Sequence, residues 1–237
     1  MNDKKNAVWI TGASSGIGRA LSSEFAKNGF FVLGTARRKD LLDELKSSLG
    51  ESRDNFEGHQ LDISNFKSLN EFYSKIPSNY QIDCLINNAG ATSFKNAIDN
   101  SIEEIENIIQ VNLLGSIFAI KSVLPEMIER KSGTIISILS VVTRKIFTAS
   151  SAYSASKSGL YAYTNVLREE VRDKNIRVIN VLPGATATAI WPDGALKKYS
   201  NRMMSVNDIA NLIFRVYSEK SNLVSEELVL RPIKGDL

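Results

Sequence analysis

Short apolar runs alternate along this chain with longer stretches in which apolar positions recur every three or four residues. The first pattern indicates buried strands and the second amphipathic helices. Seven strands are expected, at residues 7–11, 30–35, 55–61, 82–86, 134–139, 177–182 and 227–230. We find no internal repeat or linker. Residues 1–237 are therefore predicted to form one α/β domain, a doubly wound, mostly parallel sheet with helices on both faces.

Polar residues mark where several of the intervening helices begin. Ser64 is expected to cap a helix that runs to Ile76. Ser101 to Glu104 and Ser205 to Asp208 each match a capping box, and Ser151 begins another helix. Residues 189–204 lack helical periodicity and are predicted to be an irregular lid over a substrate.

A glycine-rich turn, Gly12-Ala-Ser-Ser-Gly16-Ile-Gly18, follows the first strand and leads into a helix. Glycines let the backbone turn tightly and approach a pyrophosphate, and a helix N-terminus offers free N–H groups. The alternative is a tight turn without a ligand. Since the turn lies within a strand–helix–strand unit, we favour a dinucleotide site.

The end of the second strand favours one of the two nicotinamide dinucleotides. An NAD site places Asp or Glu there to bind the ribose 2′-hydroxyl. Here Ala36 is followed by Arg37 and Arg38. Arginine pairs well with a 2′-phosphate. We therefore predict NADP(H) over NAD(H), and the alternative is two solvated arginines.

Polar or glycine residues also follow other strands, where an open parallel sheet forms its ligand crevice. They include Asp62, Asn88 with Gly90, and Ser140. Asp62 either meets an adenine amino group or serves as a turn residue. Asn112 lies in an apolar helical stretch and must find hydrogen-bond partners if buried, so it has either a site role or a core role bonded to backbone.

Tyr153 and Lys157 are four residues apart on a predicted helix and therefore share a face. A neighbouring ammonium favours the phenolate and lowers the pKa of a phenol. Such a phenol exchanges protons more readily near neutral pH. Taken alone, the pair is better explained by two surface residues that meet by chance.

Composition narrows the function classes. The formal net charge is +3, with no basic stripe, which argues against a nucleic-acid partner. The single cysteine, Cys84, and the single histidine, His59, leave no basis for a disulfide or a metal site. No apolar run approaches the roughly 18 residues needed to span a membrane. With no secretory signal pattern at the N-terminus, a cytoplasmic protein without a membrane partner is expected.

Taken in order, these motifs resemble the short-chain dehydrogenase/reductase family over nearly the whole chain. The motifs are Thr11-Gly-Ala-Ser-Ser-Gly-Ile-Gly18, Asn87-Asn-Ala-Gly90, Asn112, Ser140, Tyr153-x-x-x-Lys157 and Pro183-Gly184. The resemblance implies that Tyr153 is the general acid and base, that Lys157 lowers its pKa and binds the nicotinamide ribose, and that Ser140 bonds the substrate carbonyl. It implies that Asn112 holds a water linking Lys157 to solvent.

The resemblance also implies a homodimer or homotetramer and a small-molecule carbonyl or alcohol substrate. The expected cofactor contacts are Gly12, Ser14, Ser15, Gly16, Ile17, Gly18, Arg37, Arg38, Asp62, Ile63, Asn88, Ala89, Gly90, Tyr153, Lys157, Pro183, Gly184, Thr186 and Thr188. The C-terminal segment resembles the NADP-dependent carbonyl reductase and hydroxy-acid dehydrogenase branch. A 3-oxoacyl-carrier-protein reductase and a non-catalytic dinucleotide sensor remain alternatives.

Overall fold

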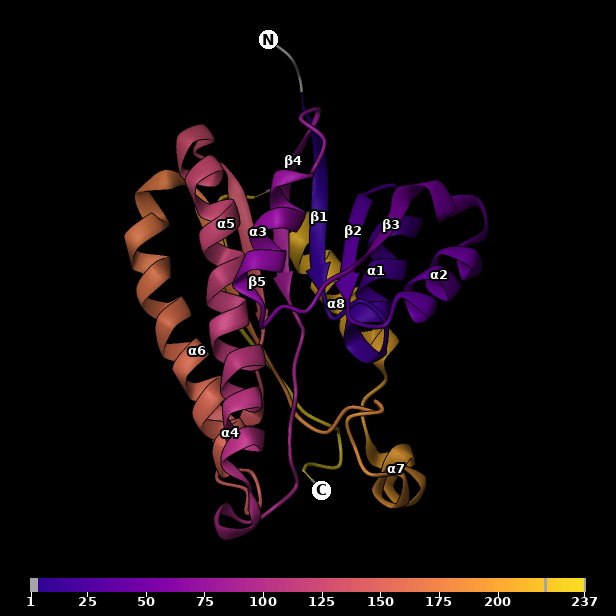
Figure 1. Cartoon of the computed structure of the whole chain (residues 1–237), viewed down its shortest axis with the longest axis vertical. Coiled ribbons are helices and arrows are strands. Elements are labelled where there is room, and N and C mark those ends of the chain that lie inside the picture. The colour runs from indigo at the N-terminus through magenta and orange to yellow at the C-terminus, as the bar shows by residue number, and fades with distance from the viewer. Residues whose placement is uncertain (1–3, 220, 237) are drawn as a thin grey trace.

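The computed structural model describes residues 4–219 and 221–236. Seven strands form one parallel sheet in the order β3-β2-β1-β4-β5-β6-β7 (Figure 1). They are β1 Lys5–Thr11, β2 Phe31–Ala36, β3 Phe56–Gln60, β4 Tyr80–Asn87, β5 Gly133–Ile138, β6 Ile176–Pro183 and β7 Glu227–Leu230. The predicted doubly wound fold is confirmed. The sequence predicts a mostly parallel sheet, and all six pairings between these strands are parallel.

The strand order reverses between β1 and β4. From β1 the chain moves outward to β2 and β3, then returns to pair β4 on the other side of β1. Connections leaving this point diverge, which opens a crevice beyond the carboxyl ends of the strands. The glycine-rich turn follows β1 directly, so the fold places it at that crevice.

Helices cover both faces of the sheet. They are α1 Gly16–Lys27, α2 Lys39–Ser48, α3 Phe66–Ser74, α4 Ile102–Ile109, α5 Gly115–Arg130, α6 Ser151–Val171, α7 Asp193–Tyr199 and α8 Val206–Ser218. Residues from α1, α2 and α8 share one apolar cluster with the strands, and residues from α3, α5 and α6 share the other. Figure 1 shows α5 and α6 together on one side and α1 and α8 on the other.

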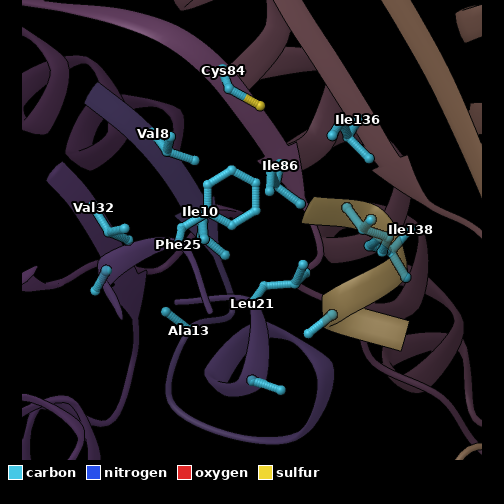
Figure 2. Packing of buried hydrophobic residues seen from close by; sticks show 14 of the residues in the cluster. Val8, Ile10, Ala13, Leu21, Phe25, Val32, Cys84, Ile86, Ile136 and Ile138 are labelled. Carbon is cyan, nitrogen blue, oxygen red and sulfur yellow. The ribbon is translucent and has the colours of Figure 1, made fainter. Parts of the chain in front are cut away.

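Burial on both faces explains the continuous apolar strands. In β1, Val8 and Ile10 point into the first cluster and Ala7 and Trp9 into the second. Figure 2 shows the first cluster, in which Leu21 and Phe25 of α1 pack against the strand residues. Cys84 lies in this cluster and is fully buried.

Three local features of the helices differ from the sequence predictions. Asn65, not Ser64, caps α3 by accepting a hydrogen bond from the Ser68 N–H. The box at Ser101 forms completely, whereas Ser205 accepts from Asn207 without the reciprocal bond. Residues 189–204 are not wholly irregular, because they contain α7. Pro192 precedes the first turn of α7, where its missing N–H costs nothing.

The helical stretch Ile102–Arg130 joins α4 and α5 through a π turn at Gln110–Leu114. By length and composition alone, this stretch is long and apolar enough to cross a membrane, although charged residues interrupt its apolar positions. In the structure, 44% of its most apolar window is buried inside the protein. Val111, Ala119 and Ile120 belong to the second apolar cluster, so the stretch serves as a core helix of the fold.

Candidate active site

A pocket of about 680 Å³ occupies the crevice at the carboxyl ends of the strands, within the usual range for small-molecule sites. Most of the predicted cofactor residues line it: Gly12, Ser14, Ser15, Gly16, Ile17, Arg37, Arg38, Asp62, Ile63, Asn88, Ala89, Gly90, Tyr153, Lys157, Pro183, Gly184, Thr186 and Thr188. Gly18, Asn112 and Ser140 are not among the lining residues. The fold therefore brings together residues from six segments of the chain.

The glycine-rich turn requires glycine for space as well as for conformation. Gly12 has a φ of +68°, and a Cβ there would lie 2.8 Å from the Ala89 Cα. A Cβ on Gly18 would lie 2.3 Å from Nδ2, the side-chain amide nitrogen of Asn88. That nitrogen donates to the Thr11 and Gly12 carbonyls at 2.9 and 3.2 Å. Asn88 thus ties the end of β4 to the turn after β1 and leaves no room for side chains.

The N-terminus of α1 has features that favour the binding of an anion. Its N-cap residue, Ser15, makes no side-chain capping bond, and the first turn holds no acidic residue. The Arg38 guanidinium donates to the Ser14 and Ser15 hydroxyls at 3.2 and 2.8 Å. Free N–H groups, the positive end of the helix dipole and a guanidinium together suit a phosphate. Arg37, exposed beside them, adds a second positive charge.

Asp62 has the turn role in the structure. Its Oδ1 accepts from the backbone N–H and the hydroxyl of Ser64, at 3.0 and 2.7 Å. These bonds fix the connection that follows β3, while Asp62 still lines the pocket. The structure therefore supports the turn role directly and leaves the predicted adenine contact as a prediction.

Tyr153 and Lys157 project from the first turns of α6 toward the end of β5. The Lys157 ammonium lies 5.8 Å from the centre of the Tyr153 ring and donates to the Ile138 carbonyl at 2.8 Å. Ser140, two residues after Ile138, begins the loop that follows β5 and is buried. The two polar groups and the hydroxyl of Ser140 therefore meet where β5 ends.

The protonation of this pair differs from the sequence prediction. Burial raises the pKa of Tyr153 to about 12, and hydrogen bonding with Ser140 opposes that rise. Burial lowers the pKa of Lys157 to about 8. The expected lowering of the tyrosine pKa by the lysine is therefore wrong for the protein without ligands. Desolvation of the phenol is the main cause of the rise, and the Lys157 ammonium donates its hydrogen bond to the Ile138 carbonyl.

Asn112 is fully buried in the π turn and bonded on both sides of its amide. Its Oδ1 accepts from the Ala91 N–H at 2.7 Å, and its Nδ2 donates to the Ala91 carbonyl and the Ser156 hydroxyl at 2.8 and 2.9 Å. A Cβ on Gly90 would lie 3.6 Å from the Asn112 Oδ1 and 3.8 Å from the Lys157 Nζ. Asn112 thus positions the segment after β4 next to Lys157.

Aromatic residues bound the pocket near the end of β5 and the segment after β6. Phe94 and Trp191 stack with ring centres 5.2 Å apart, and the indole N–H donates to the Thr186 carbonyl at 3.0 Å. Phe147 also lines the pocket. The stacking of Phe94 on Trp191 joins the segment after β4 to the predicted lid.

One lining residue has no signal in the sequence. Asp236 reaches the pocket from the C-terminal tail, where the Lys145 ammonium bonds its carboxylate at 2.9 Å. Arg144, another basic residue near the pocket, pairs instead with Glu227 and Tyr161. In the part of the chain that the structure describes, no three His, Cys, Asp or Glu side chains are grouped as a metal site requires.

Comparison with known proteins agrees with this geometry. A family model described as short chain dehydrogenase matches residues 6–197. The chain is 32% identical to a sepiapterin reductase of Chlorobaculum tepidum, over 98% of each chain. It is 30% identical to an NADP-dependent 3-hydroxy acid dehydrogenase of Escherichia coli, over 95% of this chain and 94% of that one.

Solved structures give the same result. A closed form of serine dehydrogenase complexed with NADP+ superposes with a TM-score of 0.91 at 29% identity, covering 98% of this chain and 96% of that one. Other structures of the same fold were determined with NADP or NADPH. The match over most of the sequence, the fold and the placement of the motifs agree, and the chain therefore belongs to the short chain dehydrogenase family of oxidoreductases.

Proposed function

We propose that the chain is an NADP(H)-dependent oxidoreductase that interconverts a carbonyl and a secondary alcohol by hydride transfer, with Tyr153 as general acid and base. The observation that carries this proposal is that Tyr153 and Lys157 line the same pocket as the glycine-rich turn, and that Ser140 is hydrogen-bonded to Tyr153 at the end of β5. A dinucleotide sensor does not need an acid, a hydroxyl and an ammonium in one place. The arrangement supports catalysis instead.

The pocket suits an NADP dinucleotide. The backbone of the glycine-rich turn leaves space that a Cβ would fill, and α1 offers uncapped N–H groups to a pyrophosphate. Arg37 and Arg38 supply positive charge where a 2′-phosphate lies and where NAD sites carry an acid. Several relatives of known structure hold NADP or NADPH. These features favour NADP(H) over NAD(H).

In the reduction direction, the protein supplies a proton, and the nicotinamide, when bound, supplies the hydride. Ser140 donates a hydrogen bond to the carbonyl oxygen as negative charge grows there. Tyr153, protonated at neutral pH because burial raises its pKa to about 12, gives its proton to that oxygen. Lys157 then stabilises the phenolate. In oxidation the steps reverse, and positive charge on the oxidised cofactor favours the phenolate.

The surrounding elements have supporting roles in this proposal. Asn112 holds the backbone beside Lys157 and, with a bound water, connects it to solvent. Residues 189–204, including α7, form the substrate lid, in contact with Phe94 through Trp191. The helices at 102–131 and 151–174 pair with those of a second copy in a homodimer or homotetramer, which light scattering tests.

The proposal is tested by following NADPH oxidation against a panel of ketones, aldehydes and oxo acids. Tyr153→Phe is expected to lower kcat by a factor of about 10² to 10⁴, the usual range for loss of a general acid, with little change in NADPH affinity. Tyr163→Phe, which removes a phenolic hydroxyl from the same helix outside the pocket, is the matched control. Turnover by Tyr153→Phe at the wild-type rate would refute the assignment.

A further inference from the structure

The carboxylate of Asp236 is held by two cations from different parts of the chain. The Arg231 guanidinium bonds both of its oxygens, through Nε at 3.1 Å and Nη2 at 2.5 Å. The Lys145 ammonium, from the loop after β5, bonds Oδ2 at 2.9 Å. Arg202, just after α7, donates to the Asp236 backbone carbonyl at 3.2 Å. Three segments that surround the pocket thus converge on one tail residue.

Among the described residues, two cationic side chains, those of Lys145 and Arg231, bond the carboxylate of Asp236. Arg202 bonds its backbone carbonyl, and Asp236 is the member of this cluster that lines the pocket. Its side chain is 9% exposed, whereas those of Lys145 and Arg231 are 56% and 49% exposed. The carboxylate is therefore the buried member of the cluster and the one in contact with the pocket. A substrate anion in the pocket therefore bonds Lys145 and Arg231 only when it displaces the Asp236 carboxylate.

Exchange of one carboxylate for another conserves the bonds of the cluster. Asp236 is 9% exposed and is held by two cations, so an incoming anion displaces it only by making the same charge-assisted bonds. Arg231 and Lys145 present N–H donors in a geometry that already satisfies a carboxylate, so any carboxylate of similar reach satisfies them as well. The loop after β5 that carries Lys145 also carries Ser140 and Phe147, which places the cluster at the substrate end of the pocket.

We propose that Lys145 and Arg231 form a binding site for the carboxylate of an acidic substrate, and that Asp236 fills this site when no such substrate is bound. The proposal rests on the proposed function and deepens it, by naming oxo acids and hydroxy acids as the favoured substrate class. Asp236 acts as an internal competitor and sets the preference between acidic and neutral carbonyl compounds.

The test compares each of several 2-oxo and 3-oxo acids with its own amide, which has the same shape without the charge. The measured quantity is the ratio of kcat/KM for the acid to kcat/KM for the amide, with NADPH. Asp236→Asn removes the competing charge and is expected to raise this ratio about tenfold. Adding Lys145→Gln to that variant is expected to lower the ratio again, because the acid then loses one of its partners.

Asp173→Asn is the matched control, since it removes one negative charge from an exposed ion pair with Lys174 outside the pocket lining. Its ratio is expected to equal that of the wild type. An unchanged or lower ratio in Asp236→Asn refutes the anion site and leaves the proposed function standing. Failure of the wild type to reduce any acid or amide counts against the proposed function instead.

The affinity of the protein for a dicarboxylate tests the anion site independently of turnover. Malonate, titrated by calorimetry into the protein, is expected to bind Asp236→Asn about tenfold more tightly than either the wild type or Asp173→Asn. Equal affinity for all three proteins refutes the site. Thermal unfolding of each variant confirms that the fold is retained, as expected for a substitution in the tail.

Discussion

Replacing Lys157 by methionine is expected to stabilise the protein while abolishing its activity. Lys157 is 4% exposed, and its ammonium donates to the Ile138 carbonyl at 2.8 Å. Methionine keeps most of the aliphatic chain and removes the buried charge. A group required for chemistry is thus a cost to folding, which is a common property of active sites.

The magnitude follows from the pKa of Lys157. Burial lowers it from the ordinary 10.5 to about 8, a difference that corresponds to roughly 3 kcal/mol. The unfolded chain therefore binds this proton more tightly than the folded protein does. The full cost is present below about pH 8, decreases as the pH rises, and vanishes above 10.5. Losing the bond to Ile138 costs about 1 kcal/mol, so Lys157→Met gains about 2 kcal/mol at pH 7.

Urea unfolding at pH 7 and at pH 10 measures this difference. The advantage of Lys157→Met over the wild type is expected to shrink by roughly 2 kcal/mol between the two pH values, because the buried lysine becomes neutral. Lys121→Met, at an exposed position on α5, is the control and is expected to show no such change. A variant less stable than the wild type at pH 7, or a difference independent of pH, would refute the reasoning.

Two further substitutions separate cofactor binding from structural support. Arg37→Ala is expected to weaken NADPH binding about tenfold and to leave NADH binding nearly unchanged, because a charged hydrogen bond to the 2′-phosphate is lost; equal weakening of both in a fluorescence titration contradicts the assignment. Asn112→Ala leaves the Ala91 N–H and carbonyl without their partner and is expected to cost about 1 to 3 kcal/mol in urea unfolding. The exposed Asn107→Ala is its control, and an equally small effect of both contradicts a positioning role for Asn112.

Much of the fold follows from the sequence because parallel strands buried on both faces are continuous apolar runs. The site follows for a related reason: residues after such strands meet at one edge of the sheet. Ser140 and Asn88 lie where this rule places them. Competition between neighbouring polar side chains for one capping position is harder to predict from the sequence. At the start of α3, Ser64 bonds Asp62 instead, and the neighbouring Asn65 takes the capping role.

Tertiary environment accounts for the remaining differences. The spacing of Tyr153 and Lys157 predicts their proximity, but it gives neither the burial of both groups nor the turn of the ammonium toward Ile138. Likewise, Pro192 and Gly194 obscure α7, although a proline before the first turn is compatible with a helix. Asp236 lies 91 residues from Lys145 in the chain, so no local pattern places it in the pocket.

The most direct test of the central claim is the fate of the transferred hydrogen. NADPH carrying deuterium at the reactive position of the nicotinamide is incubated with the protein and a ketone from the panel. If hydride moves directly from cofactor to carbonyl carbon, the alcohol carries deuterium at its carbinol carbon, and Tyr153→Phe forms far less of it. Deuterium lost to water, or equal labelled product from Tyr153→Phe, would contradict the account.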